Sequence, residues 1–360
     1  MKILIFYTYN KGPLSSFFEE LSLKLSKRGH EVTNFYLKHR KEHTKKGDLH
    51  IYGEKRKSFV LNYYHIYRII KQTKPNVIIS NFSYVNPALL FGSLLHVNRN
   101  ICWFHTVYGH SKPNWLKVFN KKLHLKLADA IIANSKILKG ELNTIYGYNE
   151  EKIYAIPFWT NISNYQSEDI NLDLEKDEAC LYIGCPGRLV KDKNHTIVID
   201  ALSELKKKSD KKIKLFIAGS GSYEDSLKAH VKKCNLNNDV VFLGLLSTAE
   251  MLSFYKQMDV VVLPSLNEAF GLVFIEAISL GTPVIVSSQF GSLAFIDSNE
   301  HDMERFTFNP KSKTDLVKKL EPYLNTPQFE SDYFKDLYNT TFEKSTIFKK
   351  IAHVITKHVE

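Results

Sequence analysis

The chain has 360 residues, of which 44% are hydrophobic and 24% charged, an ordinary globular composition. At about 150 residues per domain, this length predicts two domains. Lysine and arginine outnumber aspartate and glutamate by 49 to 38, which leaves nucleic acid, anionic membrane and phosphorylated substrates all open as partners. Residues 1–165 hold 25 basic and 10 acidic side chains, so the positive excess belongs to the first half.

Four cysteines without a CxxC pair exclude a disulfide framework and the usual spacing of a structural zinc site. The first residues, MKILIFYTYN, hold too short an apolar run for a signal peptide, and no stretch approaches the roughly 18 apolar residues of a membrane-spanning helix. We therefore expect a cytoplasmic protein, either soluble or peripheral on the inner face of the membrane.

Short apolar runs alternate with helical periods along the first half. Residues 3–7 predict a strand, residues 14–25 a helix that Gly29 ends, and EVTNFYL the next strand. Further β-rich runs lie at residues 77–80, 101–105 and 130–134. This alternation predicts a parallel sheet with helices on both faces.

An acidic, polar segment at residues 166–177 has no long apolar period and is predicted to be a linker. Strands are then predicted at residues 179–184, 213–218, 239–243, 259–263 and 283–287, and Ser247 with Glu250 forms a capping-box pattern. We expect an α/β protein with two doubly wound domains, 1–165 and 178–340. Residues 341–360 predict an amphipathic terminal helix that can pack back on the first domain.

The densest motif is PSLNEAFGLVFIEAISLGTPVIV, which follows the predicted strand DVVVLP. It puts Glu268 in a loop and Glu276 eight residues later on a helix that begins at Gly271 and Leu272, after Phe270. Backbone N–H groups at a helix start bind phosphate, and Gly271 allows a ligand to approach closely. Glu276 can accept two hydrogen bonds from a ribose, and Glu268 can face a sugar. The alternative is that both glutamates are solvated surface residues.

Two further loops follow predicted strands of the second half. GRLVKDKNH supplies Arg188 and Lys193, whose charges can neutralise a departing diphosphate, although an ordinary basic loop explains them as well. AGSGS places Gly219 and Gly221 where a nucleotide can approach the backbone, and tight-turn geometry is the alternative there.

The first half offers one candidate side chain, in ICWFH. His105 ends a β-rich run and either faces a crevice or packs beside Trp103. The first turn, YNKGPLSSF, lacks GxGxxG, and the second strand ends in FYLKH without the acidic residue that binds the NAD ribose. NAD chemistry is therefore disfavoured, and no other cofactor is expected.

Basic stretches KHRKEHTKK and EKRKSF, followed by Tyr63, Tyr64 and Tyr67, carry much of the excess charge of the first half. We interpret them as solvated loops. Basic residues interleaved with aromatic ones also suit an anionic membrane surface. No nucleic-acid-binding module accompanies the charge, so no nucleic-acid partner is expected.

GRLVKDKN, AGSG, FLG, DVVVLPSLNEAFG and EAISLGTPV occur in this order over residues 178–287. With these motifs the second half resembles the retaining glycosyltransferases of family 4, also called glycosyl transferases group 1, which have the GT-B fold. The first half resembles the family more loosely, through SKRGHEV, IIANS and IYAIP. The resemblance implies two Rossmann-like domains that face each other across a cleft.

The resemblance also implies a hexosyltransferase-type enzyme. Its donor is a nucleotide diphosphate-sugar held mainly by the second domain, and its acceptor is held by the first. The basic first half suggests that this acceptor is a glycan or lipid-linked molecule of surface polysaccharide biosynthesis. By position, Arg188 and Lys193 match the diphosphate clamp, Glu268 the carboxylate at the sugar, and Glu276 the ribose ligand. His105 matches a histidine of the crevice. There is no DxD-type motif in either crevice loop, so we expect a metal-independent enzyme.

The chain departs from the family pattern at two places. Gly12 corresponds to a first loop that often has two adjacent glycines, and here Lys11 precedes a single one. Phe158 and Trp159 stand where the family often has Asn-Gly, so we expect an altered wall between the domains.

Two other functions fit parts of the pattern. A nucleotide-sugar epimerase of the same fold would use the same donor site without an acceptor. A non-catalytic protein of the membrane surface would keep the donor site without turnover.

Overall fold

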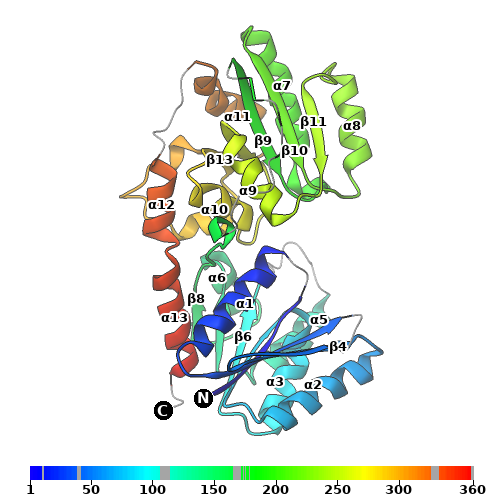
Figure 1. The fold of residues 1–360 in the computed structure, drawn as a ribbon, viewed down its shortest axis with the longest axis vertical. Helices are drawn as coiled ribbons and strands as arrows, with labels where there is room; N and C mark the ends of the chain where they lie inside the picture. The colour runs from blue at the N-terminus through cyan, green and yellow to red at the C-terminus, as the bar shows by residue number, and fades with distance from the viewer. Residues whose placement is uncertain are drawn as a thin grey trace. The chain divides into compact units, whose positions relative to one another are not determined.

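The computed structural model describes residues 1–9, 12–38, 42–105, 114–164, 172, 174, 176–177, 179–325 and 332–357. The chain divides into two compact units, the first formed by Met1–Trp159 with Lys344–Glu360 and the second by Thr160–Glu343 (Figure 1). Most of the predicted linker, residues 166–177, lies outside the described residues. No helix within the described ranges is long and apolar enough to cross a membrane.

The first unit is built on an eight-stranded sheet with the order β3-β4-β2-β1-β5-β6-β7-β8. Its strands are β1 (Lys2–Phe6), β2 (Glu31–Lys38), β3 (Glu42–Lys46), β4 (Leu49–Lys55), β5 (Val77–Asn81), β6 (Arg99–Phe104), β7 (Ala130–Ala133) and β8 (Ile153–Ala155). Neighbouring strands run parallel, except that β3 is antiparallel to β4.

Helices cover both faces of this sheet, because successive side chains of a strand point to opposite sides. The helices are α1 (Pro13–Ser26), α2 (Phe59–Thr73), α3 (Val85–Leu94), α5 (Trp115–Leu125), α6 (Lys136–Thr144) and α13 (Lys344–Thr356). On one face Leu4 and Phe6 pack in a core with residues of α2 and α3. On the other face Trp103 contacts Phe17 of α1, with ring centroids 5.4 Å apart.

The terminal helix α13 belongs to the first unit. Arg99 Nε donates a hydrogen bond of 2.9 Å to the carbonyl of Val354, and Lys344 Nζ donates one of 3.0 Å to Glu20 Oε1. The other oxygen of Glu20 accepts a hydrogen bond of 2.6 Å from the indole of Trp159. Glu20 therefore links α1 to both ends of the segment that leaves and re-enters this unit.

The second unit has a six-stranded parallel sheet with the order β11-β10-β9-β12-β13-β14. Its strands are β9 (Cys180–Pro186), β10 (Lys212–Ala218), β11 (Val240–Gly244), β12 (Val260–Leu263), β13 (Val284–Ser287) and β14 (Thr307–Phe308). Its helices are α7 (His195–Lys208), α8 (Glu224–Lys233), α9 (Thr248–Gln257), α10 (Leu272–Ser279), α11 (Lys313–Leu320) and α12 (Tyr333–Thr341).

The prediction of two α/β units with parallel sheets is confirmed, and so is the capping box, in which Ser247 and Glu250 exchange hydrogen bonds. The interpretation of KHRKEHTKK as a solvated loop is wrong for Glu42–Lys46, which forms β3. This strand lies at the edge of the sheet, where charged side chains remain in water, so it lacks the apolar alternation of a half-buried strand.

Each sheet changes winding direction at one point. In the first unit, β1 has β2 on one side and β5 on the other, and in the second unit β9 lies between β10 and β12. The loops that follow such flanking strands diverge and leave a crevice at the carboxyl ends. These switch points are where a ligand is expected in each unit.

The loops after β9 and β10 run backbone against backbone. The N–H of Gly187 donates to the carbonyl of Ala218, and the N–H of Leu189 to that of Ser220, both at 2.9 Å. A Cβ atom at Gly221 would lie 2.3 Å from the carbonyl oxygen of Leu189, and one at Gly219 would lie 2.0 Å from that of Gly187. Glycine is therefore required at both positions by the contact between the loops.

We predict that Gly221→Ala lowers the free energy of unfolding by about 2 kcal/mol or more, because the new methyl group overlaps a backbone carbonyl that cannot move alone. Gly140→Ala is the matched control, since Gly140 lies inside α6 with nothing near its missing Cβ. That substitution is expected to stabilise by about 0.5–1 kcal/mol through helix propensity. Urea unfolding of both variants measures the difference, and equal stability of the two would contradict the steric argument.

Candidate functional site

The switch point of the second unit brings two of the predicted site residues together. Lys193 ends the 3₁₀ helix η4 (Lys191–Lys193), between β9 and α7, and Glu268 lies in the loop between β12 and α10. Their side chains are mostly buried and form an ion pair. The sequence predicts each of these residues for a donor site, but not the direct contact between them.

Backbone and amide hydrogen bonds hold the loops around this ion pair. The N–H of Leu266, after β12, donates to the carbonyl of Asp192 at 2.9 Å. Asn194 has the left-handed φ of 57° and donates through Nδ2 to the carbonyls of Pro264 (3.2 Å) and Pro310 (2.9 Å). The loops after β9, β12 and β14 are thus tied to one another beside Lys193.

The loop that carries Glu268 is held by its own backbone. The N–H of Glu268 donates to the carbonyl of Gln289 at 3.1 Å, and its carbonyl accepts from the N–H of Gly291 at 2.9 Å. Gly271, which precedes α10, has a φ of 96°, and a Cβ there would lie 2.3 Å from the ring of Phe290. Both the dihedral angle and the contact therefore require glycine at the start of this helix.

The residues on either side of Gly271 differ in exposure. Leu272 is half-buried at the first position of α10. The ring of Phe270 is buried and packs near Phe295 and Phe342, with centroids 6.3 and 6.2 Å away. A donor contact by Phe270 would therefore come from its backbone.

Three other predicted donor residues have different surroundings. Arg188 is exposed in the loop after β9. Gly221 faces the carbonyl of Leu189, so the structure explains this glycine by loop packing, and its role toward a nucleotide stays a prediction. Gly12 precedes α1 in the first unit with extended backbone, φ −89° and ψ 172°, and its carbonyl accepts from the N–H of Ser16 at 3.1 Å.

Glu276 lies inside α10 and is only 4% exposed, which excludes the alternative of a solvated glutamate. Tyr255 of α9 donates a hydrogen bond of 3.0 Å to its Oε2 atom. Burial raises the pKa of Glu276 to about 7, since the charged form is poorly hydrated, and the hydrogen bond from Tyr255 acts against this rise. No pattern in the sequence predicts this contact, because Tyr255 comes from another helix.

His105 follows β6 in the first unit and packs among aromatic rings. Its ring stacks on Phe82 at 4.6 Å and on Phe158 at 5.6 Å, and Trp103 lies 6.3 Å away. Both ring nitrogens are shielded from solvent, and within the described part of the chain neither has a hydrogen-bond partner. Burial lowers the pKa of His105 to about 3, so the imidazole is neutral at pH 7.

The described residues include one group of three side chains arranged like metal ligands, which the sequence analysis missed. Asp200 of α7 and His230 and Cys234, on or next to α8, place their ligand atoms within 4.8 Å of one another. His230 Nε2 lies 2.6 Å from Asp200 Oδ1. This group contains none of the predicted donor residues.

Two sequence models of families together match both units. The model described as Glycosyl transferases group 1 matches residues 166–338, and that described as Glycosyltransferase Family 4 matches residues 14–163. The chain belongs to the group 1 glycosyltransferases. The resemblance drawn from the motifs of the second half is therefore confirmed.

This group 1 glycosyltransferase is 30% identical over 223 residues to an uncharacterized glycosyltransferase of Methanocaldococcus jannaschii, an alignment that covers 59% of this chain and 55% of that protein. It is 31% identical over 216 residues to the capsular polysaccharide biosynthesis glycosyltransferase CapM of Staphylococcus aureus, covering 57% and 54%. The chain thus spans little more than half the length of these relatives.

The fold is shared with HepE of Anabaena, whose structure contains UDP and glucose. The TM-score is 0.77 at 16% sequence identity, and the match covers 99% of each chain. This likeness confirms the predicted GT-B fold.

We predict that Glu276→Gln changes how stability depends on pH. Folding raises the pKa of Glu276 from its ordinary value of 4.5 to about 7, so between these pH values the unfolded state releases the proton more readily than the folded state does. The wild type therefore loses stability as pH rises across that window. Between pH 5 and pH 8 the free energy of unfolding of Glu276→Gln should therefore rise by about 1–3 kcal/mol relative to that of the wild type. Melting temperatures of the two proteins across this pH range measure the change.

Tyr255→Phe is the companion variant, because it removes the hydrogen bond that favours the charged carboxylate. It should destabilise more at pH 8 than at pH 5. A difference in melting temperature between Glu276→Gln and wild type that stays constant with pH would contradict the buried, titrating carboxyl.

Proposed function

We propose that this protein transfers a sugar, with retention of anomeric configuration, from a nucleotide diphosphate-sugar to a glycan or lipid-linked acceptor. The observation that carries the proposal is the ion pair of Lys193 and Glu268 at the switch point of the second unit, beside the start of α10. CapM is named for capsular polysaccharide biosynthesis, and the HepE structure contains UDP and glucose, which supports a hexosyl donor and a role in surface polysaccharide assembly.

The chemistry follows from the charge that develops when the anomeric bond breaks. The sugar becomes positive and the diphosphate gains negative charge, so cations and N–H groups aimed at the phosphates lower the barrier. Arg188 and Lys193 supply the cations, and the backbone N–H groups at Gly271 and Leu272 supply donors at a helix start. These groups neutralise the leaving diphosphate, so the proposed reaction is metal-independent.

The carboxylates take different parts in this proposal. Glu268 positions Lys193 and accepts hydrogen bonds from sugar hydroxyls, and Glu276 accepts hydrogen bonds from the ribose. His105 and Gly12 of the first unit stay predicted site residues, and the imidazole of His105 is neutral at pH 7 with both ring nitrogens shielded from solvent. A phosphate oxygen of the leaving group takes the proton of the acceptor hydroxyl on the same face of the sugar, which accounts for retention.

We predict that Arg188→Ala and Lys193→Ala each reduce kcat by about a hundredfold, because each removes a charge that acts on the leaving group. The assay uses the nucleotide sugar identified by a thermal-shift screen of UDP, GDP, ADP and their sugars, since a ligand of the native state raises its melting temperature. Lys191→Ala, an exposed lysine two residues before Lys193, is the matched control and should retain activity.

Activity in excess EDTA should equal that without it, and a strict need for a divalent metal would contradict the proposed clamp. Unchanged rates in both alanine variants would also contradict it. Incubation of the donor alone tests the epimerase alternative, since an epimerase converts the donor without an acceptor. Binding of the donor without any transfer would favour the non-catalytic alternative.

We also propose that the first unit rests on an anionic membrane surface through α5. Trp115 is 74% exposed, and Leu116, Phe119 and Leu123 of the same helix are exposed as well. Lysines at positions 117 and 122 flank these apolar side chains. An apolar face bordered by lysines is typical of helices that lie in the interface of a bilayer containing acidic lipids. The proposed location is therefore cytoplasmic and peripheral.

We predict that Trp115→Ser combined with Phe119→Ser weakens binding to vesicles of phosphatidylcholine and phosphatidylglycerol by about tenfold or more, because two large side chains no longer enter the interface. Ile137→Ser is the control, since Ile137 is 54% exposed on α6 of the same unit. Vesicle sedimentation measures both. Equal binding to vesicles of phosphatidylcholine alone would contradict the contribution of charge.

A further inference from the structure

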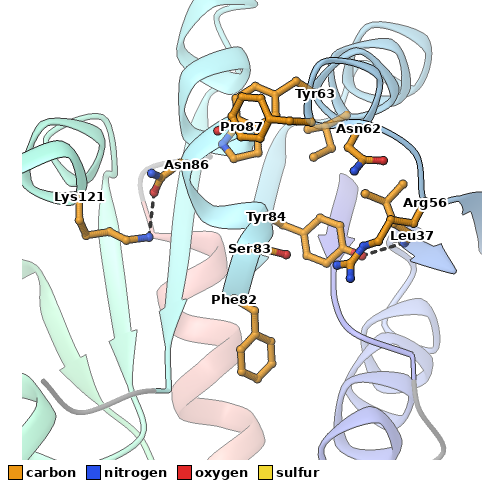
Figure 2. A pocket seen from close by; sticks show the side chains of 12 residues that line it. Leu37, Arg56, Asn62, Tyr63, Phe82, Ser83, Tyr84, Asn86, Pro87 and Lys121 are labelled. Carbon is orange, nitrogen blue, oxygen red and sulfur yellow. Dashed lines mark hydrogen bonds between the residues drawn. The ribbon is translucent and has the colours of Figure 1, made fainter. Parts of the chain in front are cut away.

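The first unit contains a pocket of about 350 Å³, within the size range of small-molecule sites. Figure 2 shows its lining, which comes from β2, α2, α3, α5 and the segments after β4 and β5. The polar and aromatic side chains that matter below are Arg56, Asn62, Tyr63, Phe82, Asn86 and Lys121. None of these residues is among the predicted donor residues.

The pocket lies at the switch point of the first sheet. Phe82–Tyr84 form a 3₁₀ turn directly after β5, and Leu37 lies near the carboxyl end of β2, on the other side of β1. The N–H of Leu37 donates a hydrogen bond of 2.7 Å to the hydroxyl of Tyr84, which closes one wall (Figure 2). This is the edge of a doubly wound sheet where ligands bind.

Phe82 joins the pocket to the candidate catalytic histidine. Its φ is 52°, a strained value for a residue with a side chain, and its ring is 40% exposed. That ring stacks on His105 at 4.6 Å and extends away from the other labelled lining residues in Figure 2. Phe82 thus borders both the pocket and His105.

The charged groups that line the pocket are both cations. Arg56 and Lys121 lie on opposite sides of the pocket in Figure 2, and the lining within the described residues contains no aspartate or glutamate. Lys121 is half-buried, donates a hydrogen bond of 2.8 Å to Asn86 Oδ1 and lies 5.8 Å from the centroid of the Phe104 ring. Partial burial lowers its pKa.

In the part of the chain that the structure describes, neither Arg56 nor Lys121 forms an ion pair with a carboxylate. Arg56 is exposed, whereas the half-buried Lys121 is partly withdrawn from water without a counter-charge, and an anionic ligand offsets the cost of that burial. Arginine and lysine together suit a phosphoryl group, which accepts both a planar fork and a point charge.

The remaining lining is mostly apolar and aromatic and continues to the surface. Tyr63, Ile66 and Tyr84 line the interior, and Phe59 lines the rim, where it is 70% exposed next to the exposed Val60. An apolar or ring-bearing part of a ligand can contact these side chains while its charged part faces the cations. The lining therefore fits a molecule with a phosphoryl group beside an apolar or sugar-ring portion.

We infer that this pocket binds the acceptor and selects one that carries a phosphoryl group next to an apolar or sugar-ring portion. Calling the ligand the acceptor rests on the proposed function, whereas the selection for a phosphoryl group rests on the pocket alone. Two sources share this chemistry, a soluble sugar phosphate and a lipid phosphate.

The test measures binding to the full chain by ³¹P NMR and calorimetry, with glucose 6-phosphate and short-chain dihexanoyl phosphatidic acid as probes. Glucose and dihexanoylglycerol are their neutral counterparts. At least one phosphorylated probe should bind more tightly than its neutral counterpart, and the probe that binds identifies the source. Arg56→Gln and Lys121→Gln should each weaken that binding by about tenfold, the effect of losing one charged hydrogen bond.

The matched controls are Lys71→Gln on α2 and Lys126→Gln after α5, which remove a charge nearby but outside the lining. Both should bind as the wild type does, and Lys121→Arg should restore most of the affinity lost in Lys121→Gln. The inference is overturned if neither phosphorylated probe binds, if the neutral counterparts bind equally well, or if the pocket variants match the controls.

Failure of this inference can be told apart from failure of the proposed function. The donor residues Arg188 and Lys193 belong to the second unit, so thermal shifts with nucleotide sugars report on them separately. If the protein transfers sugar only to neutral acceptors, and Arg56→Gln leaves that activity unchanged, the inference about the pocket is overturned and the proposed transferase activity stands. Phosphoryl binding in the pocket without any donor binding would do the reverse.

Discussion

The direction in which each sheet is wound determines where its side chains can form a site. In a parallel sheet all strands end at the same edge, and two flanking strands that lie on opposite sides of a central one send their loops apart. In the second unit this brings η4 and the loop after β12 together, and with them Lys193 and Glu268. In the first unit it places Phe82 beside a pocket that contains Arg56.

Much of the fold could be predicted because its signal is local. Buried parallel strands such as β9 and β12 are short, continuous apolar runs. The capping box of Ser247 and Glu250 marks the residue at which α9 begins. The order of the motifs in the second half was sufficient for the family, and it placed Lys193 and Glu268 in loops at the carboxyl edge. Strand β3 was not predicted, because its edge position allows a charged sequence without the apolar alternation of a half-buried strand.

The contacts inside the sites could not be predicted, because they join residues far apart in the chain. Lys193 and Glu268 are separated by 75 positions, and only the strand order brings them into contact. The buried carboxyl of Glu276 accepts a hydrogen bond from a tyrosine of another helix. Phe82 gives no pattern in the sequence, since neither its strained backbone nor its stacking on His105 is encoded in its neighbours.

The ion pair of Lys193 and Glu268 has a consequence for the end of a catalytic cycle under the proposed function. The two side chains bind different groups: the ammonium of Lys193 binds negatively charged oxygens, and the carboxylate of Glu268 accepts hydrogen bonds from hydroxyl groups. An intact nucleotide sugar supplies both and can replace the pair. The nucleotide diphosphate that remains after transfer has lost its hexose and interacts only with the lysine. Re-formation of the ion pair between Lys193 and Glu268 therefore competes with binding of this diphosphate. The ion pair, which is neutral as a whole, thus favours expulsion of the by-product over its retention.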